Sequence, residues 1–333
     1  MNSFIRNISI TKKLAFLLAL PLLLLAWLLT EQFVTNIQNV RTAQHLTQAI
    51  NISTELSKLI GSLQAERGAT AVFIDSEGKR FSQRLAENRK ATDSQVTTFN
   101  NMAQHEVNLQ TQLTKLAQLR QQVDSFSLNG SAAIAAYNTM IADMITFNYQ
   151  LEAQIKHLDM ARQVAALNQF LELKDRTGRE RAILARTFTH DSFTPELLTL
   201  YATNLGAYRA YEDSMRKMLH PALTEAWQQA LTSSKFQEVE QIRQKASNTN
   251  IAVSFGINSD NWFDLASQKL AIMNEFEHKL FAQLSADTSK VYQDAMSKLW
   301  PIIAFMVIAI VVLCWLTLAI IRNIAIAVQD IDG

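Results

Sequence analysis

Residues 299–321 read LWPIIAFMVIAIVVLCWLTLAII, twenty-three residues without a charged side chain. An α-helix rises about 1.5 Å per residue, so about 20 apolar residues span the hydrocarbon core of a bilayer. A second uncharged run near the amino terminus, residues 14–29, reads LAFLLALPLLLLAWLL. The two runs enclose one long polar segment, and together they predict a membrane protein with a single large domain outside the bilayer.

Charges beside the two runs predict the orientation of the chain. Arg6, Lys12 and Lys13 precede the first run and Arg322 follows the second, so the positive-inside rule predicts that both ends are cytoplasmic. The expected location is a bacterial inner membrane, crossed twice. The expected segments are a cytoplasmic amino terminus (1–13), a first transmembrane helix (14–30), a periplasmic domain (31–298), a second transmembrane helix (299–321) and a linker (322–333).

The first run has an alternative interpretation as a cleaved signal peptide, whose apolar core is typically 7–15 residues long. No site of the small-x-small type follows it, which favours an uncleaved anchor. The single cysteine, Cys314, lies inside the second run. A domain without disulfides is therefore expected, and about 270 residues can bury a core without them.

Composition also bears on partners and chemistry. The net charge of +1 gives no reason to expect a nucleic acid partner. The six histidines are far apart in the sequence, which argues against a metal site, and we expect no cofactor. No nucleophile elbow or phosphate-binding loop is present, so we do not expect an enzyme.

The polar segment is predicted to be helical throughout. The chain has only eight Gly and four Pro, and residues that favour helices are abundant. Turn signals at 75–79, 127–131 and 189–195 separate the apolar repeats. The predicted helices are 31–74, 80–125, 131–188, 195–218, 221–247 and 261–298, and the longest can break into two. We therefore expect an all-α bundle of long antiparallel helices, whose first and last helices continue into the membrane.

Arginines interrupt the apolar stripes of two of these helices. The stripe of the first helix is marked by Ala49, Ile52, Leu56, Leu59 and Leu63, which recur every three or four residues. Arg67 occupies the next position of that stripe. In the 131–188 helix, Arg181 lies in register with Leu171 and Gly178, and the glycine leaves room for a group to approach the backbone.

Two interpretations of the buried arginines remain open. A buried guanidinium without a partner costs several kcal/mol, so each needs an anion. Carboxylates of the domain are one source, and the candidates are Glu66, Glu172, Asp175 and Glu180. The other source is a small external anion on which two or more arginines converge, because a planar guanidinium matches the oxygens of a planar oxyanion. Arg243 is a further candidate for that pocket.

Two motifs resemble the NIT domain, the nitrate- and nitrite-sensing domain of bacterial receptors. The first is LQAERGATA at 63–71, where the family reads Leu-Gln-x-Glu-Arg-Gly followed by small residues. The second is LKDRTGRERA at 173–182, where the family favours Lys-Glu-x-x-Gly-x-Glu-Arg-Ala and this chain has Asp175 for the first Glu. Trp262-Phe263-Asp264 is similar to the start of the family's closing helix. The resemblance covers about residues 55–285.

The resemblance implies a helical bundle with an arginine-lined pocket for nitrate or nitrite. By motif match, Arg67 and Arg181 are the expected ligand contacts. Arg243 matches a looser family position, and Arg179 is a neighbour of the second motif. We expect the anion to bridge Arg67 and Arg181, to draw the first and third helices together and to shift the last helix.

Residues 320–331 are similar to the first helix of a HAMP relay, with Ala327 where that family often has proline. We therefore expect the front part of a longer, homodimeric receptor. The favoured function is a methyl-accepting chemotaxis receptor that acts on a cytoplasmic kinase and adaptor. One alternative is the sensor region of a histidine kinase or a cyclic-dinucleotide synthase, and another is a membrane scaffold whose arginines are paired internally.

Overall fold

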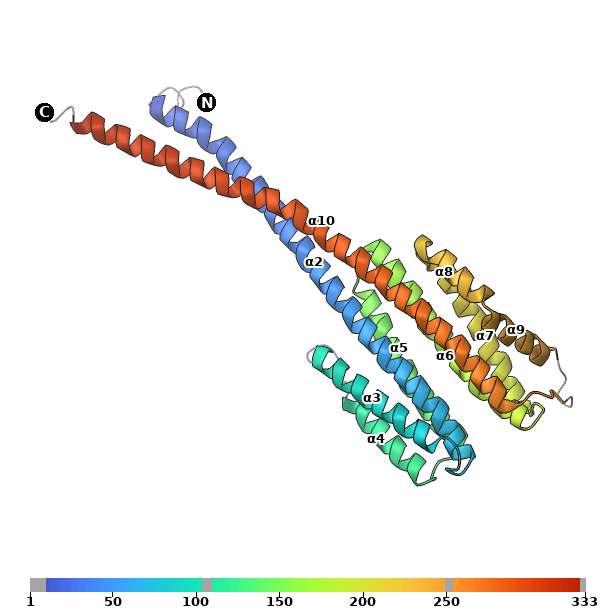
Figure 1. The fold of residues 1–333 in the computed structure, drawn as a ribbon. Helices are drawn as coiled ribbons and strands as arrows, with labels where there is room; N and C mark the ends of the chain where they lie inside the picture. The colour runs from blue at the N-terminus through green and yellow to red at the C-terminus, as the bar shows by residue number, and fades with distance from the viewer. Residues whose placement is uncertain (1–9, 104–109, 249–253, 330–333) are drawn as a thin grey trace. The chain divides into compact units, whose positions relative to one another are not determined.

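The computed structural model describes residues 10–103, 110–248 and 254–329. Within these ranges the chain is helical with short connections, and no strand occurs. The all-α prediction is therefore confirmed. The chain divides into two compact units, a central unit (Gln48–Asp287) and a terminal unit (Met1–Thr47 with Thr288–Gly333). Two long helices, α2 (Ile10–Asp75) and α10 (Ser259–Gln329), belong to both units (Figure 1).

The central unit contains the inner parts of α2 and α10 and the helices between them. These are α3 (Ser82–Ala103), α4 (Gln110–Asp124), α5 (Gly130–Ala153), α6 (Leu158–Thr189), α7 (Pro195–Met218), α8 (Pro221–Thr232) and α9 (Ser234–Ser247). Helix α6 packs along α7 and against α5, and α8 packs against α9 (Figure 1). Most connections are short, which holds successive helices beside one another.

Capping residues explain where two of these helices begin. Helix α7 has the predicted bounds, because the Thr194 side chain accepts a hydrogen bond from the N–H of Leu197 and Pro195 occupies the first turn. Helix α10 begins at Ser259, two residues before the predicted start at 261. The cap is Asn258, whose Oδ1 accepts the N–H groups of Asp260 and Asn261.

The longest predicted helices are broken. The 131–188 helix divides into α5 and α6 at residues 154–157, and the 221–247 helix divides into α8 and α9 at Ser233. No Gly or Pro marks either break. At Ser233 the backbone is extended, and the hydroxyl donates to the carbonyl of Ala230 at 2.6 Å. This side-chain bond satisfies a carbonyl that a continuous helix would bond through its backbone. The 80–125 helix corresponds to α3 and α4, and residues 104–109 lie outside the described residues.

Buried side chains fix α2, α6 and α10 of the central unit against one another. Glu277 of α10 accepts from Ser57 of α2 at 2.6 Å and from Lys174 of α6 at 2.7 Å. All three side chains are largely buried. Phe170 of α6 also packs on Phe276 of α10, with ring centroids 5.3 Å apart. This contact among three helices sets the relative positions of α2 and α6, which carry the arginines of the two stripes.

The terminal unit pairs the outer parts of α2 and α10. Val40, Ala295 and Leu299 form its small buried cluster. Farther along α10 the large apolar side chains are exposed, with Trp300 at 61% and Trp315 at 67%. Among the described residues, α10 is the one helix long and apolar enough to cross a membrane. The two transmembrane spans and the HAMP-like segment therefore stay predictions, and residues 330–333 lie outside the described residues.

Candidate anion site

The two arginines of the apolar stripes are buried where α2 meets α6. Arg67 is 2% exposed and Arg181 is 8% exposed. The positions before them on each stripe, Leu63 of α2 and Gly178 of α6, are also buried. The 3.6-residue helical repeat therefore carries each guanidinium into the packed interior, as the stripes predict.

Arg67 has a carboxylate partner and one nitrogen left over. Its Nη1 donates to Asp175 Oδ1 of α6 at 2.7 Å and to Asn138 Oδ1 of α5 at 2.6 Å. Its Nη2 is buried and has no hydrogen-bond partner in the described structure. Burial alone would raise the pKa of Asp175, but the charges of Arg67 and Arg179 hold it below its usual value. Arg67 therefore has a counter-charge in Asp175, and one of its donors remains unused.

Arg181 has no such counter-charge. Its Nη1 donates to the hydroxyl of Ser267 on α10 at 2.8 Å, and its guanidinium lies 4.4 Å from the ring centroid of Phe263. Its Nε is buried and unpaired, and no carboxylate in the ranges described above forms an ion pair with it. Burial and the nearby positive charges of Arg67 and Arg84 lower the pKa of Arg181 well below that of a free arginine.

Glycines let the two guanidiniums approach the facing helix backbones. A β-carbon added at Gly178 of α6 would lie 2.6 Å from Nη2 of Arg67, and one added at Gly68 of α2 would lie 2.5 Å from Nη2 of Arg181. Any larger residue would displace the guanidinium. Gly68 follows Arg67 on α2, and Gly178 lies one turn before Arg181 on α6. Each arginine packs against the glycine of the other helix, so both guanidiniums lie where α2 crosses α6.

The other two candidate arginines have partners already. Each of the three nitrogens of Arg243 donates to a carboxylate, Nε and Nη2 to Glu180 and Nη1 to Glu240, all at 2.7 Å. Arg179 donates through Nε to Asp175 Oδ2 at 2.6 Å and is partly exposed. The structure thus brings Arg67, Arg181 and Arg179 together around Asp175 and Gly178, and it places Arg243 in a separate ion pair.

Internal pairing also accounts for the other candidate carboxylates, Glu66 and Glu172. Glu66, the residue before Arg67, receives two bonds from Arg120 at 2.7 and 2.8 Å and one from the hydroxyl of Tyr137 at 2.8 Å. Burial and Glu66 raise the pKa of Tyr137. Glu172 pairs with Arg176 on its own helix. No carboxylate of the two motifs is therefore free to neutralise Arg181.

Sequence reasoning missed Asn138, Ser267 and Phe263 as contacts of the two arginines. Asn138 and Ser267 are short polar residues on helices predicted only approximately, and nothing in their spacing distinguishes them from surface residues. Phe263 is part of the third stretch that resembles the NIT domain, which could have indicated a place near the site.

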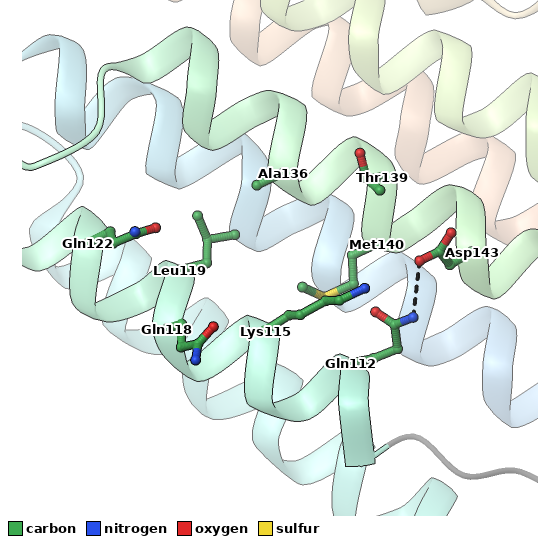
Figure 2. A pocket seen from close by; sticks show the side chains of 9 residues that line it. All are labelled: Gln112, Lys115, Gln118, Leu119, Gln122, Ala136, Thr139, Met140 and Asp143. Atoms are coloured by element: carbon green, nitrogen blue, oxygen red, sulfur yellow. Dashed lines mark hydrogen bonds between the residues drawn. The ribbon is translucent and has the colours of Figure 1, made fainter.

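A groove of about 330 Å³ lies elsewhere, between α4 and α5 (Figure 2). Lys115 and Met140 are among the residues that line it, and Gln112 bridges it by donating to Asp143 at 3.0 Å. None of the candidate arginines lines this groove. Its lining contains one cation, Lys115, and one carboxylate, Asp143, among uncharged residues, so the groove does not share the character of the arginine pair.

Comparisons with known proteins bear on the family and the fold of the chain. Residues 58–285 match the model of the NIT family, which is described as nitrate and nitrite sensing. The nitrate regulatory protein of Klebsiella oxytoca is 24% identical over 251 residues, which are 72% of this chain and 63% of that protein. The structure of the NasR transcription antiterminator matches with a TM-score of 0.69 at 21% identity, over 81% of this chain and 82% of that one. This last likeness shows the fold.

These relatives correct the predicted function and partners. The prediction of a chemotaxis receptor, or of another membrane receptor with a kinase or cyclic-dinucleotide synthase as output, is wrong, because the relatives are a nitrate regulatory protein and a transcription antiterminator. The predictions of a kinase complex at the membrane and of no nucleic acid partner are wrong for the same reason. Apolar runs indicate membrane attachment and net charge indicates which partners are favoured electrostatically. Neither determines which process a sensing domain controls.

The family assignment rests on the match to residues 58–285, which includes both arginine motifs and most of the chain. The chain spans 63% of the length of its curated relative, so the assignment concerns the sensing region. The chain belongs to the NIT family of nitrate and nitrite sensing domains.

Proposed function

We propose that the central unit binds nitrate or nitrite between α2 and α6, and that Arg67 and Arg181 are the ligand residues. One observation carries the proposal: Nη2 of Arg67 and Nε of Arg181 are buried N–H donors without partners. Buried donors are nearly always satisfied in folded proteins. Two unsatisfied donors on facing guanidiniums therefore support a site for a small acceptor.

The chemistry of the two arginines favours a planar oxyanion. Guanidinium donors lie in a plane and match two oxygens of a planar acceptor such as nitrate or nitrite. The surroundings add no further negative charge at Arg181, so a single negative charge completes the balance there.

Ligand binding would change the contact among three helices. Without the anion, the positive charges of Arg67 and Arg181 repel each other in an environment of low dielectric constant. With the anion bound, both guanidiniums are attracted to the same negative charge, which draws α2 and α6 together. Because Arg181 also contacts Ser267 and Phe263, the change reaches α10. The anion thus favours one arrangement of α2, α6 and α10 over another.

Arg243 and Arg179 receive different roles in this proposal. The two bonds from Arg243 to Glu180 consume the donors that a ligand would need, so we assign Arg243 to holding α9 on α6. Arg179 helps Asp175 to keep its negative charge, and Asp175 in turn positions Arg67. The unit binds and does not catalyse in this account.

Isothermal titration of the full chain in detergent with sodium nitrate and sodium nitrite tests the proposal. Wild type is expected to bind one anion per chain. Arg181→Met should abolish binding, because a neutral side chain of similar length removes the charge. Arg209→Gln, a change at an exposed arginine of α7, should leave affinity unaltered. Absence of binding by wild type, or equal affinity in Arg181→Met, would show that the arginines serve only the packing of the domain.

We further propose that the anion site is the input of a nitrate-responsive regulator. The name of the Klebsiella oxytoca relative supports this, since it is called a nitrate regulatory protein. Transcript profiles of cells that carry wild type or Arg181→Met, with and without nitrate, test it. Nitrate should change a set of transcripts in wild type and not in the variant. Identical profiles in the two strains would contradict the regulatory role.

For location, we propose that the apolar part of α10 lies in a membrane. Its side chains are exposed, among them Trp300 and Trp315, and exposed apolar surface of this extent is unfavourable in water. Carbonate extraction of the membrane fraction of cells that express the chain tests the proposal. The chain is expected to stay with the membranes. Recovery of the wild-type chain as a monodisperse protein without detergent would contradict the proposal.

A further inference from the structure

An exposed arginine on α3, Arg84, has no charged partner in the described structure. Its guanidinium lies 5.0 Å from the ring centroid of Phe81 and 5.7 Å from that of Phe263. No hydrogen bond or ion pair joins it to another described residue, and its side chain is open to solvent. An arginine held on two aromatic rings without a carboxylate keeps its full charge and its donors available.

The same phenylalanine connects Arg84 to the buried site. Phe263 lies 4.4 Å from the guanidinium of Arg181 and 5.7 Å from that of Arg84. One ring therefore contacts a buried cation and an exposed cation. The charge of Arg84 also contributes to lowering the pKa of Arg181. Arg84 thus couples the surface of the central unit electrostatically to Arg181 of the buried pair.

Local structure places Arg84 at this position. Phe81 has a φ of 63°, in the left-handed region that phenylalanine seldom adopts, and this turn starts α3 one residue later. The Phe81 ring packs edge-on against Phe263 at 5.6 Å. Arg84 follows within the first turn of α3, over both rings. The other arginine of this segment, Arg80, is already paired with Asp260.

We infer that Arg84 is the solvent-facing arginine of the anion site, which attracts nitrate or nitrite to Arg67 and Arg181 and raises its affinity there. The inference rests on the proposed function. A single exposed charge several ångströms from the bound anion adds a modest attraction in a partly aqueous environment. That attraction is screened by salt, because the Debye length falls from about 30 Å at 0.01 M to about 3 Å at 1 M.

Titration calorimetry of the full chain with sodium nitrate tests the inference at two ionic strengths set with sodium gluconate. At about 0.01 M, Arg84→Gln is expected to weaken binding about two- to fivefold, the effect of one screened charge at this range. Arg84→Lys keeps the charge and should bind nearly as wild type does. Arg209→Gln removes an exposed arginine of α7 and should bind as wild type does. At about 1 M the loss in Arg84→Gln should disappear.

The outcomes separate this inference from the function on which it rests. If wild type binds nitrate and Arg84→Gln binds it equally well at low ionic strength, the role of Arg84 is refuted while the buried site stands. A loss that persists in full at high salt, or that also occurs in Arg84→Lys, would show that the side chain acts through packing, and would refute the electrostatic role. If wild type does not bind nitrate, the proposed function fails and this inference fails with it.

Discussion

The guanidinium of Arg67 lies against Gly178, with Nη2 2.6 Å from the position that a β-carbon would occupy. Gly68 gives Arg181 the same access in the opposite direction. The glycines of the two motifs are therefore explained by the arginines of the facing helices. The arrangement costs helix stability, because Gly in a helix interior is less favourable than Ala, and it buries two cations beside each other.

Gly178→Ala should separate stability from ligand binding. Alanine favours the helix by about 0.5–1 kcal/mol, but its methyl group would occupy the position beside Nη2 of Arg67. We expect a free energy of unfolding close to that of wild type, and at least tenfold weaker nitrate binding. Chemical denaturation and titration calorimetry measure the two quantities.

Gly206→Ala is the matched control, because a β-carbon at Gly206 of α7 would meet no atom within 4 Å. It should stabilise the fold by about 0.5–1 kcal/mol and leave nitrate affinity unchanged. Equal nitrate binding by the Gly178 and Gly206 variants would mean that the contact between Gly178 and Arg67 has no part in the site.

Asp175→Asn should make the fold more dependent on the anion. Asp175 pairs with Arg67 and accepts from Arg179, so its loss leaves two cations without a carboxylate and should destabilise the free protein by about 3–5 kcal/mol. The same change removes a negative charge near the site, so added nitrate should raise the melting temperature more than it does in wild type. A nitrate-induced shift equal to or smaller than that of wild type would contradict this prediction.

The ion pair of Arg243 and Glu180 should matter for stability and not for binding. Both side chains are almost completely buried, and burial would raise the pKa of Glu180 if Arg243 did not hold it below its usual value. Arg243→Met leaves that carboxylate unpaired and should cost about 3–5 kcal/mol. The double variant with Glu180→Gln should recover much of the loss in urea denaturation. Nitrate affinity lost in the double variant despite recovered stability would assign Arg243 to the ligand.

Lys269 should make stability depend on pH. Burial and the charge of Arg243 lower its pKa from 10.5 to about 7 in the folded protein, and its Nζ lies over the rings of Tyr208 and Phe236. Charged or titratable groups near it are Arg243, Glu180, Glu240, Glu212 and Tyr208.

Between pH 7 and about 10 the unfolded chain binds more protons at Lys269 than the folded chain does. Its contribution to the free energy of unfolding should therefore rise with pH across that range, by at most about 1.4 kcal/mol per pH unit. Below pH 7 the buried charge is destabilising, so Lys269→Met should be more stable than wild type at pH 6 and should lose this rise. Parallel curves for the two proteins in urea denaturation between pH 6 and 9 would contradict the prediction.

Periodic patterns predicted the fold better than they predicted helix ends. The apolar repeat before Arg67 placed that residue inside the bundle, and the turn signal at 189–195 located the start of α7. The break at Ser233 was not predictable, because it arises from a side-chain bond to the carbonyl of Ala230 and carries no Gly or Pro signal. The cap at Asn258 was missed because three adjacent residues are all good capping types.

Motifs predicted the arginines of the site but not the partner of each one. Whether Arg67 or Arg181 receives a carboxylate depends on the relative rotation of α2 and α6, which spacing along one chain does not determine. The sequence could name Asp175 and Glu180 as possible partners, and the fold gave Asp175 to Arg67 and Glu180 to Arg243. The chain's apolar runs, in contrast, led to a wrong prediction of its function.

An experimental structure of the full chain with nitrate bound tests the central claim most directly. The account predicts one nitrate between α2 and α6, with its oxygens within hydrogen-bond distance of Nη2 of Arg67 and Nε of Arg181, and with Asp175 still paired to Arg67. Nitrate bound elsewhere, with both of those nitrogens still unpaired or satisfied by protein groups, would contradict it.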